Sequence, residues 1–232
     1  MNSTGVKQKL EEMEVEVLSG NMILPGSLAI PAAARGMVLF AHGSGSSRYS
    51  PRNRFVARML HEHGLATLLF DLLTPEEEVH DRISAHLRFD IELLTKRLVG
   101  ATDWAEKNPA TRNLQLGYFG ASTGAAAALV AAAQRGEEIV AVVSRGGRPD
   151  MAGAALERVS AATLLIVGGE DTIVLDLNRE ALAALGCVHK KLTVVPGATH
   201  LFEEPGALEK AGRAAAEWFE RYLGAEIVPA AN

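Results

Sequence analysis

The sequence of 232 residues has a single cysteine, no excess of basic charge and no long apolar run. Cys187 has no second cysteine to pair with, which excludes an internal disulfide framework. Lysine and arginine number 23 against 28 acidic residues, so the basic surface typical of nucleic-acid binding is absent. No segment has the length of a membrane span, and residues 1–16 lack the apolar core of a signal peptide. We therefore expect a cytoplasmic protein with neither a nucleic-acid nor a membrane partner.

What the sequence does contain is a regular alternation of two patterns. Short apolar segments typical of buried strands lie at residues 36–41, 65–70, 114–119, 139–143, 163–167 and 192–195. Segments with helical spacing lie between and after them, at residues 51–63, 125–133, 175–185 and 205–223. This alternation predicts an α/β fold, with a mostly parallel sheet covered by helices on both faces. Because the chain has no internal repeat and no low-complexity linker, we expect one domain over residues 1–232, with its core at about 14–223.

Two segments depart from this alternation. Residues 13–18 and 22–30 flank a Ser-Gly-Asn turn and read as an antiparallel pair at one edge of the sheet. Residues 74–108 form the longest stretch without a strand, and their apolar spacing predicts either one long helix or two. We expect the part up to Phe89 to overhang a functional site.

The most informative motif is the G-x-S-x-G at residues 120–124, which stands between an apolar strand and an alanine-rich helix. In this setting the motif is a nucleophile elbow, a strained turn that exposes a serine above the start of a helix. Ser122 is the predicted nucleophile. The alternative is a tight turn without a chemical role.

A serine hydroxyl needs a base to remove its proton, usually a histidine oriented by a carboxylate. In a parallel sheet such groups gather beyond the carboxyl ends of the strands. His200 directly follows the last predicted strand and is our candidate for the general base. His42 also follows a strand, but we expect it mainly to orient the adjacent loop by hydrogen bonding.

Asp171 is the predicted carboxylate that orients His200, because it follows the strand at residues 163–167 after only three residues. Asp150 is the rival, but it follows a longer loop and lies beside Arg148, which would bind its charge. The order Ser122, Asp171, His200 is the order of the triad in α/β-hydrolases.

The predicted oxyanion donors are the backbone N–H groups of Thr123, which follows the nucleophile, and of Ser44, in the small-residue loop after residues 36–41. The loop could instead cradle a phosphate, but neither Gly-Lys-Ser/Thr nor G-x-G-x-x-G is present. We predict no cofactor and no metal.

Three arginines, Arg48, Arg145 and Arg148, lie in loops that leave the carboxyl ends of strands. Together they could bind an anionic group of a substrate. The alternative is that they pair with acids such as Asp71 and Asp150 and hold the loops in place.

The motifs at residues 42–48, 117–124, 144–150, 168–171 and 197–200 resemble those of the α/β-hydrolase superfamily, and within it the small dienelactone-hydrolase-like branch. The resemblance spans roughly residues 14–223, and some members of the branch are fused to a phosphoribosyltransferase domain. It implies a Ser-His-Asp hydrolase without a large cap domain. True dienelactone hydrolases carry a cysteine nucleophile, whereas this chain has Ser122, which favours ordinary carboxylic esters.

We therefore expect a serine hydrolase (a carboxylesterase) that acts on small to medium carboxylic esters through an acyl-enzyme. One alternative is an acyltransferase that uses the same triad, and another is a non-catalytic binding protein with a hydrolase fold. The expected partner is a small-molecule ester. The acyl and alcohol groups of the substrate and the oligomeric state are not encoded in these motifs.

Overall fold

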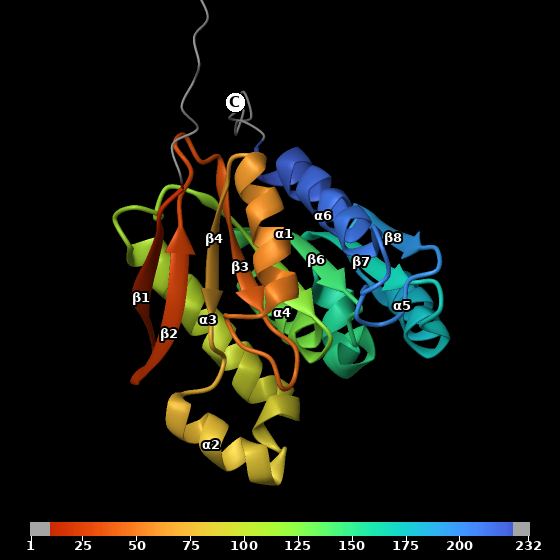
Figure 1. Cartoon of the computed structure of the whole chain (residues 1–232), viewed down its shortest axis with the longest axis horizontal. Helices are drawn as coiled ribbons and strands as arrows, with labels where there is room; N and C mark the ends of the chain where they lie inside the picture. Colours follow the sequence, from red (N-terminus) through yellow and green to blue (C-terminus); the bar gives the residue numbers. More distant parts are fainter. Residues whose placement is uncertain (1–9, 225–232) are drawn as a thin grey trace, which may run out of the picture.

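A computed structural model describes residues 10–224, whose strands form one sheet in the order β1-β2-β4-β3-β5-β6-β7-β8 (Figure 1). The strands are β1 (Glu12–Ser19), β2 (Met22–Ala29), β3 (Gly36–Ala41), β4 (Leu65–Phe70), β5 (Gln115–Ala121), β6 (Ile139–Arg145), β7 (Ala162–Gly168) and β8 (Lys190–Val195). β1 pairs with β2 and β2 with β4 in antiparallel fashion, and all other pairs are parallel. The predicted edge pair and the mostly parallel sheet are thus confirmed.

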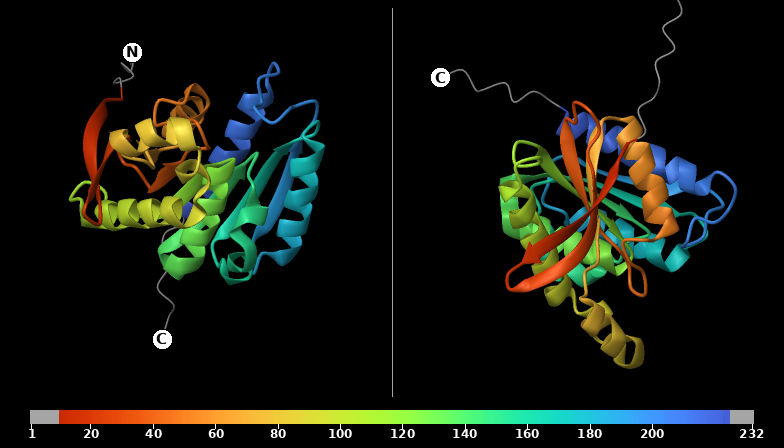
Figure 2. Two further views of the ribbon diagram at one scale, coloured as in Figure 1. Left: turned by 90° about the horizontal axis from the view of Figure 1, so that it is seen from below. Right: turned by 60° about the vertical axis from the view of Figure 1, so that its left-hand side comes forward.

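Helices cover both faces of this sheet (Figures 1 and 2). The α-helices are α1 (Pro51–Glu62), α2 (Pro75–Ser84), α3 (Ile91–Lys107), α4 (Thr123–Arg135), α5 (Thr172–Ala184) and α6 (Ala207–Leu223). The 3-10 helices are η1 (Leu87–Phe89), η2 (Gly136–Glu138) and η3 (Pro149–Arg158). α1 and α6 pack on one face, and α3, α4 and α5 lie on the other. Within residues 10–224 no helix is both long and apolar enough to span a bilayer.

Each face of the sheet has its own hydrophobic core, and β3 contributes to both. Met37 and Leu39 belong to the core under α3 and α4, whereas Val38 and Phe40 belong to the core under α1 and α6. Successive residues of a strand point to opposite faces, so a strand covered on both sides must be apolar throughout. Cys187 is buried as a free thiol.

The segment at residues 74–108 divides into α2, η1 and α3, so the prediction of two helices is the correct one. α2 protrudes from the body of the molecule (Figure 1), and Asp81 is its one buried residue. Asp81 accepts hydrogen bonds from the N–H of Leu87 (2.7 Å) and from Nε of Arg88 (2.5 Å). A second ion pair, between Glu77 and Arg97 at 2.6 Å, attaches α2 to α3. The helix is therefore held by polar contacts instead of by an apolar face.

Candidate active site

Ser122 occupies the turn between β5 and α4 with a φ of 51° and a ψ of −122°. A positive φ is strained for any residue with a side chain, and it is the geometry expected of a nucleophile elbow. The flanking glycines make this turn possible. A Cβ on Gly124 would lie 2.2 Å from the carbonyl oxygen of Ala41, and one on Gly120 would lie 2.4 Å from Cα of Ala125. Only glycine therefore lets α4 approach the sheet closely enough to present Ser122.

His200 and Asp171 meet beyond the ends of β8 and β7. Nδ1 of His200 lies 2.6 Å from Oδ2 of Asp171. Their loops are joined by backbone bonds, because the N–H of Glu170 donates to the carbonyl of Ala198 at 2.9 Å. This contact brings together two residues that are 29 positions apart in the sequence.

Asp150, the rival acid, is engaged elsewhere. It accepts two hydrogen bonds from Arg148, at 2.9 and 2.7 Å. The charge of Asp150 is thus neutralised locally, whereas Asp171 is bound to the imidazole of His200.

Ser122 and His200 line the same pocket, which has a volume of about 230 Å³. The other lining residues are Gly43, Ser44, Ser46, Ser50, Arg52, Asn53, Ala121, Arg145 and Leu201. None of these lining residues is acidic, and residues 10–224 contain no group of three or more His, Cys, Asp or Glu residues placed to hold a metal ion. The pocket is therefore polar and carries positive charge.

The two predicted oxyanion donors lie side by side, but only one of them is free of a partner. Thr123 is the first residue of α4, and the amides of a first helical turn have no partner within the helix. The N–H of Ser44 instead donates to Oγ1 of Thr123 at 3.0 Å. The amide of Ser44 is therefore engaged by the side chain of Thr123, and its role as an oxyanion donor stays a prediction.

His42 connects the loop after β3 to the end of β4. Its Nε2 accepts a hydrogen bond from the N–H of Leu72 at 3.1 Å, so the ring proton must be on Nδ1, which donates to the carbonyl of Gly43 at 3.0 Å. Burial lowers the pKa of His42, which keeps the ring neutral. This geometry fits the predicted role of orienting the loop that carries Ser44.

The structure does not bring the three predicted anion-binding arginines together. Arg48 forms an ion pair with Asp71 and a second one with Glu14 at 3.3 Å. Arg148 is bound to Asp150 by the two hydrogen bonds described above. For these two arginines the expectation of a shared anion site is wrong, because nearby acids already neutralise them.

Arg145 differs from the other two because it lines the pocket of Ser122 and is only 6% exposed. Its Nη2 makes a long hydrogen bond of 3.4 Å to Oδ1 of Asn53, and its Nε and Nη1 have no partner. The guanidinium also lies over the ring of Phe202, 5.6 Å from the ring centroid. Burial, with a smaller contribution from the charge of Arg52, lowers the pKa of Arg145 to about 10.

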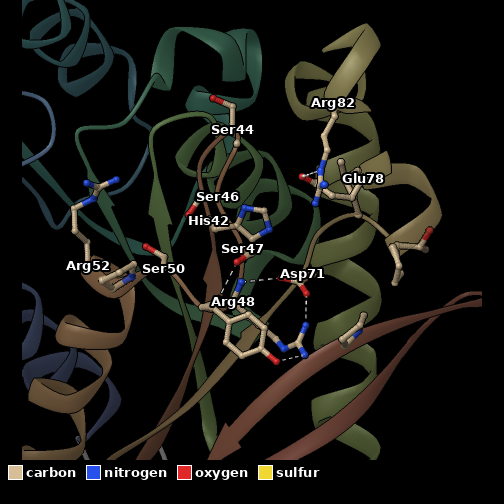
Figure 3. Close-up of a pocket in the computed structure, with 17 residues that line it drawn as sticks. His42, Ser44, Ser46, Ser47, Arg48, Ser50, Arg52, Asp71, Glu78 and Arg82 are labelled. Carbon is tan, nitrogen blue, oxygen red and sulfur yellow. Dashed lines mark hydrogen bonds and ion pairs between the residues drawn. The ribbon is translucent and has the colours of Figure 1, made fainter. Parts of the chain in front are cut away.

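A larger trough of about 590 Å³ adjoins this pocket and shares Ser44, Ser46, Ser50 and Arg52 with it (Figure 3). Residues along the protruding helix α2, including Glu78 and Arg82, line its far side. No residue of the 74–89 segment lines the pocket of Ser122. The predicted overhang therefore faces the trough and not the nucleophile itself.

Sequence reasoning missed Arg52 and Asn53 as residues of the pocket. Both lie in the first turn of α1, whose N-cap is Ser50 and whose first residue is Pro51. The predicted helical segment at residues 51–63 was the available signal, because a helix that follows the loop after β3 begins beside the proposed oxyanion donors. Its first turn therefore faces the site.

Comparison with known proteins identifies the family and the fold of the chain. The model of the dienelactone hydrolase family matches residues 24–223. The chain belongs to the dienelactone hydrolase family. A dienelactone hydrolase from Anabaena variabilis is 59% identical and superimposes with a TM-score of 0.91, with 93% of this chain and 100% of that one covered. Est1E from Butyrivibrio proteoclasticus shares the fold, at 17% identity and a TM-score of 0.74 over 90% of this chain and 98% of that one. The α/β-hydrolase fold predicted from the motifs is thus confirmed.

A Mycobacterium tuberculosis protein named "Putative phosphoribosyl transferase" is 57% identical over 216 residues. The match covers 92% of this chain but only 47% of that protein. The chain thus spans about half the length of this relative.

Proposed function

We propose that this member of a hydrolase family is a serine hydrolase of small to medium carboxylic esters. The observation that carries the proposal is the 2.6 Å contact between His200 and Asp171, in a site where His200 and Ser122 line one pocket. A carboxylate on Nδ1 leaves Nε2 of the imidazole to accept the proton of a serine. The strained backbone of Ser122 is a second support.

In the proposed reaction, Oγ of Ser122 attacks the ester carbonyl while His200 removes the hydroxyl proton. The negative charge that forms on the carbonyl oxygen is stabilised by the N–H of Thr123 and by the N–H of Ser44 once it leaves Thr123 Oγ1. His200 then gives its proton to the departing alcohol. Water, activated by the same histidine, attacks the acyl-enzyme and releases the acid, so that no cofactor takes part.

The test is labelling of the protein with a fluorophosphonate probe, combined with turnover of an ester panel that varies the acyl chain. We expect one label on Ser122, and no label or turnover for Ser122→Ala, which should remain folded. A folded wild type that neither reacts with the probe nor hydrolyses any ester would contradict the proposal.

A triad of this kind also serves acyltransferases. Product analysis in the presence of an added alcohol or amine separates the two reactions, since a hydrolase releases mainly the free acid. We expect the free acid.

A further inference from the structure

The pocket of Ser122 has an unusual charge balance. It is lined by two arginines, Arg52 and Arg145, and by no acidic residue. Arg52 pairs at 3.1 Å with Glu203, an exposed acid outside the pocket, whereas Arg145 has no carboxylate partner within residues 10–224. Burying a guanidinium without a counter-charge is costly, which makes the arrangement unexpected for a purely structural side chain.

The hydroxyl groups in the pocket add to its donor capacity. Ser44, Ser46 and Ser50 all line it, and Ser50 uses its oxygen to accept from the N–H of Asn53 at 3.3 Å, which leaves its hydroxyl proton to donate. The positive dipole end of α1 lies at the same place, although Pro51 has no N–H and the N–H of Asn53 is already bonded to Ser50. Every one of these features suits an anion.

The number of positive charges in the pocket indicates which class of anion it would bind. The pair between Arg52 and Glu203 is solvent-exposed and weak, so Arg52 can exchange it for a ligand. With Arg52 released, two guanidinium groups match a group of charge about −2, as a phosphate monoester has at neutral pH, better than a single carboxylate of charge −1. A phosphate also offers three acceptor oxygens, which can be shared between arginine N–H groups and serine hydroxyls.

We propose that the pocket between Arg145 and Arg52 binds a phosphate group carried by the substrate, next to the ester bond that Ser122 attacks. This inference rests on the proposed function and specifies its substrate class as phosphorylated esters. Arg145 is the buried anchor, and Arg52 exchanges Glu203 for the phosphate. The phosphate is a recognition group and is not cleaved.

Binding can be tested without catalysis, with inorganic phosphate as the probe and calorimetry on folded Ser122→Ala protein at constant ionic strength. We expect saturable binding to one site, weakened at least tenfold by Arg145→Gln and by Arg52→Gln. Arg145→Lys, which keeps the positive charge, should lose less phosphate affinity than Arg145→Gln. The matched control is Arg179→Gln on the surface of α5, where Arg179 pairs with Asp176, and it should bind as the parent does.

Three results would overturn the proposal: no saturable phosphate binding, binding that neither Arg145→Gln nor Arg52→Gln weakens, or succinate binding as tightly as phosphate. Arg52 is partly exposed, so its variant remains informative if Arg145→Gln does not fold.

Turnover provides the second arm, with acetate release from 2-acetoxyethyl phosphate compared with that from the neutral 2-methoxyethyl acetate. Arg145→Gln should lower kcat/KM about tenfold for the phosphorylated ester and little for the neutral one. An equal loss for both esters would show a structural role and reject the phosphate site. If the wild type cleaves neither ester and resists the fluorophosphonate, the proposed function fails, while the calorimetry still decides whether the pocket binds phosphate.

Discussion

The backbone N–H of Ser44 donates a hydrogen bond to Oγ1 of Thr123 over 3.0 Å, and this bond joins the loop after β3 to the first residue of α4. Both residues are the proposed oxyanion donors, so one donor is held by the side chain of the other. A substrate oxyanion must compete with the threonine hydroxyl for the Ser44 amide. The contact therefore sets how readily the site accepts a developing negative charge.

Thr123→Val removes the competing oxygen while keeping the shape of the side chain and the backbone amide. A neutral hydrogen bond contributes about 0.5–1.5 kcal/mol, so we expect kcat/KM for a simple ester to rise by roughly two- to tenfold. Thr123→Ser keeps the hydroxyl and should resemble the wild type. Steady-state kinetics with one ester checks both variants, and a decrease for Thr123→Val alone would mean that the hydroxyl assists the reaction.

Asp171→Asn keeps the size of the side chain but removes its charge. An amide cannot hold the imidazole of His200 in the tautomer that accepts the serine proton, and kcat should fall roughly a thousand- to ten-thousandfold. Glu170→Gln, at the neighbouring position, is the matched control and should keep its activity. Comparable turnover by Asp171→Asn and the wild type would remove Asp171 from the proposed triad.

Gly124→Ala tests the packing that presents the nucleophile. The added methyl group would lie 2.2 Å from the carbonyl oxygen of Ala41, which belongs to the backbone of β3 and cannot move aside cheaply. Such overpacking costs about 1–3 kcal/mol of unfolding free energy, measured by urea denaturation. Gly169→Ala places its methyl group 3.4 Å from the nearest atom, at an ordinary contact distance. It should unfold like the wild type, and equal stability of both variants would contradict the close approach of α4.

The stability of the protein should decrease on acidification. Burial lowers the pKa of His42, and burial together with the charge of Arg58 brings the pKa of His61 to about 4. In the unfolded chain a histidine takes up a proton below about pH 6.5. The unfolded state then binds more protons than the folded one, so the free energy of unfolding falls from about pH 6.5 toward pH 4.

Urea denaturation at pH 7 and pH 5 measures this dependence. His61→Gln should show a smaller loss between the two pH values than the wild type, whereas His80→Gln, at an exposed position of α2, should show the same loss. If His61→Gln and the wild type showed the same pH dependence, His61 would be excluded as a cause of the loss of stability at low pH.

Local sequence patterns were sufficient to predict the sheet and the elbow. The run at residues 36–41 is apolar at every position because each face of β3 is covered, and the glycines on either side of Ser122 form a short motif that is visible in the sequence. Each of these patterns lies within the segment whose structure it predicts. The pairing of His200 with Asp171 followed from the rule that strand ends share one edge of a parallel sheet.

The hydrogen-bond and ion-pair partners of the pocket residues depend on which loops lie next to each other. Local sequence patterns do not indicate which loops these are. Arg48 lies in the loop after β3 and Arg145 is the last residue of β6, yet Asp71 pairs only with Arg48. Likewise, nothing in the pattern indicates that a threonine side chain would accept from the Ser44 amide. Contacts between segments far apart in the chain decided these outcomes.

The attachment of α2 has a consequence for how new specificities could arise in this family. Because the helix contributes a single buried residue and is fixed by two ion pairs, its length and composition can vary without disturbing either core. Replacement of this one segment would reshape the adjoining trough while the machinery at the strand ends stayed intact. The wall of the trough that α2 forms and the residues of the Ser122 pocket thus belong to separate parts of the chain.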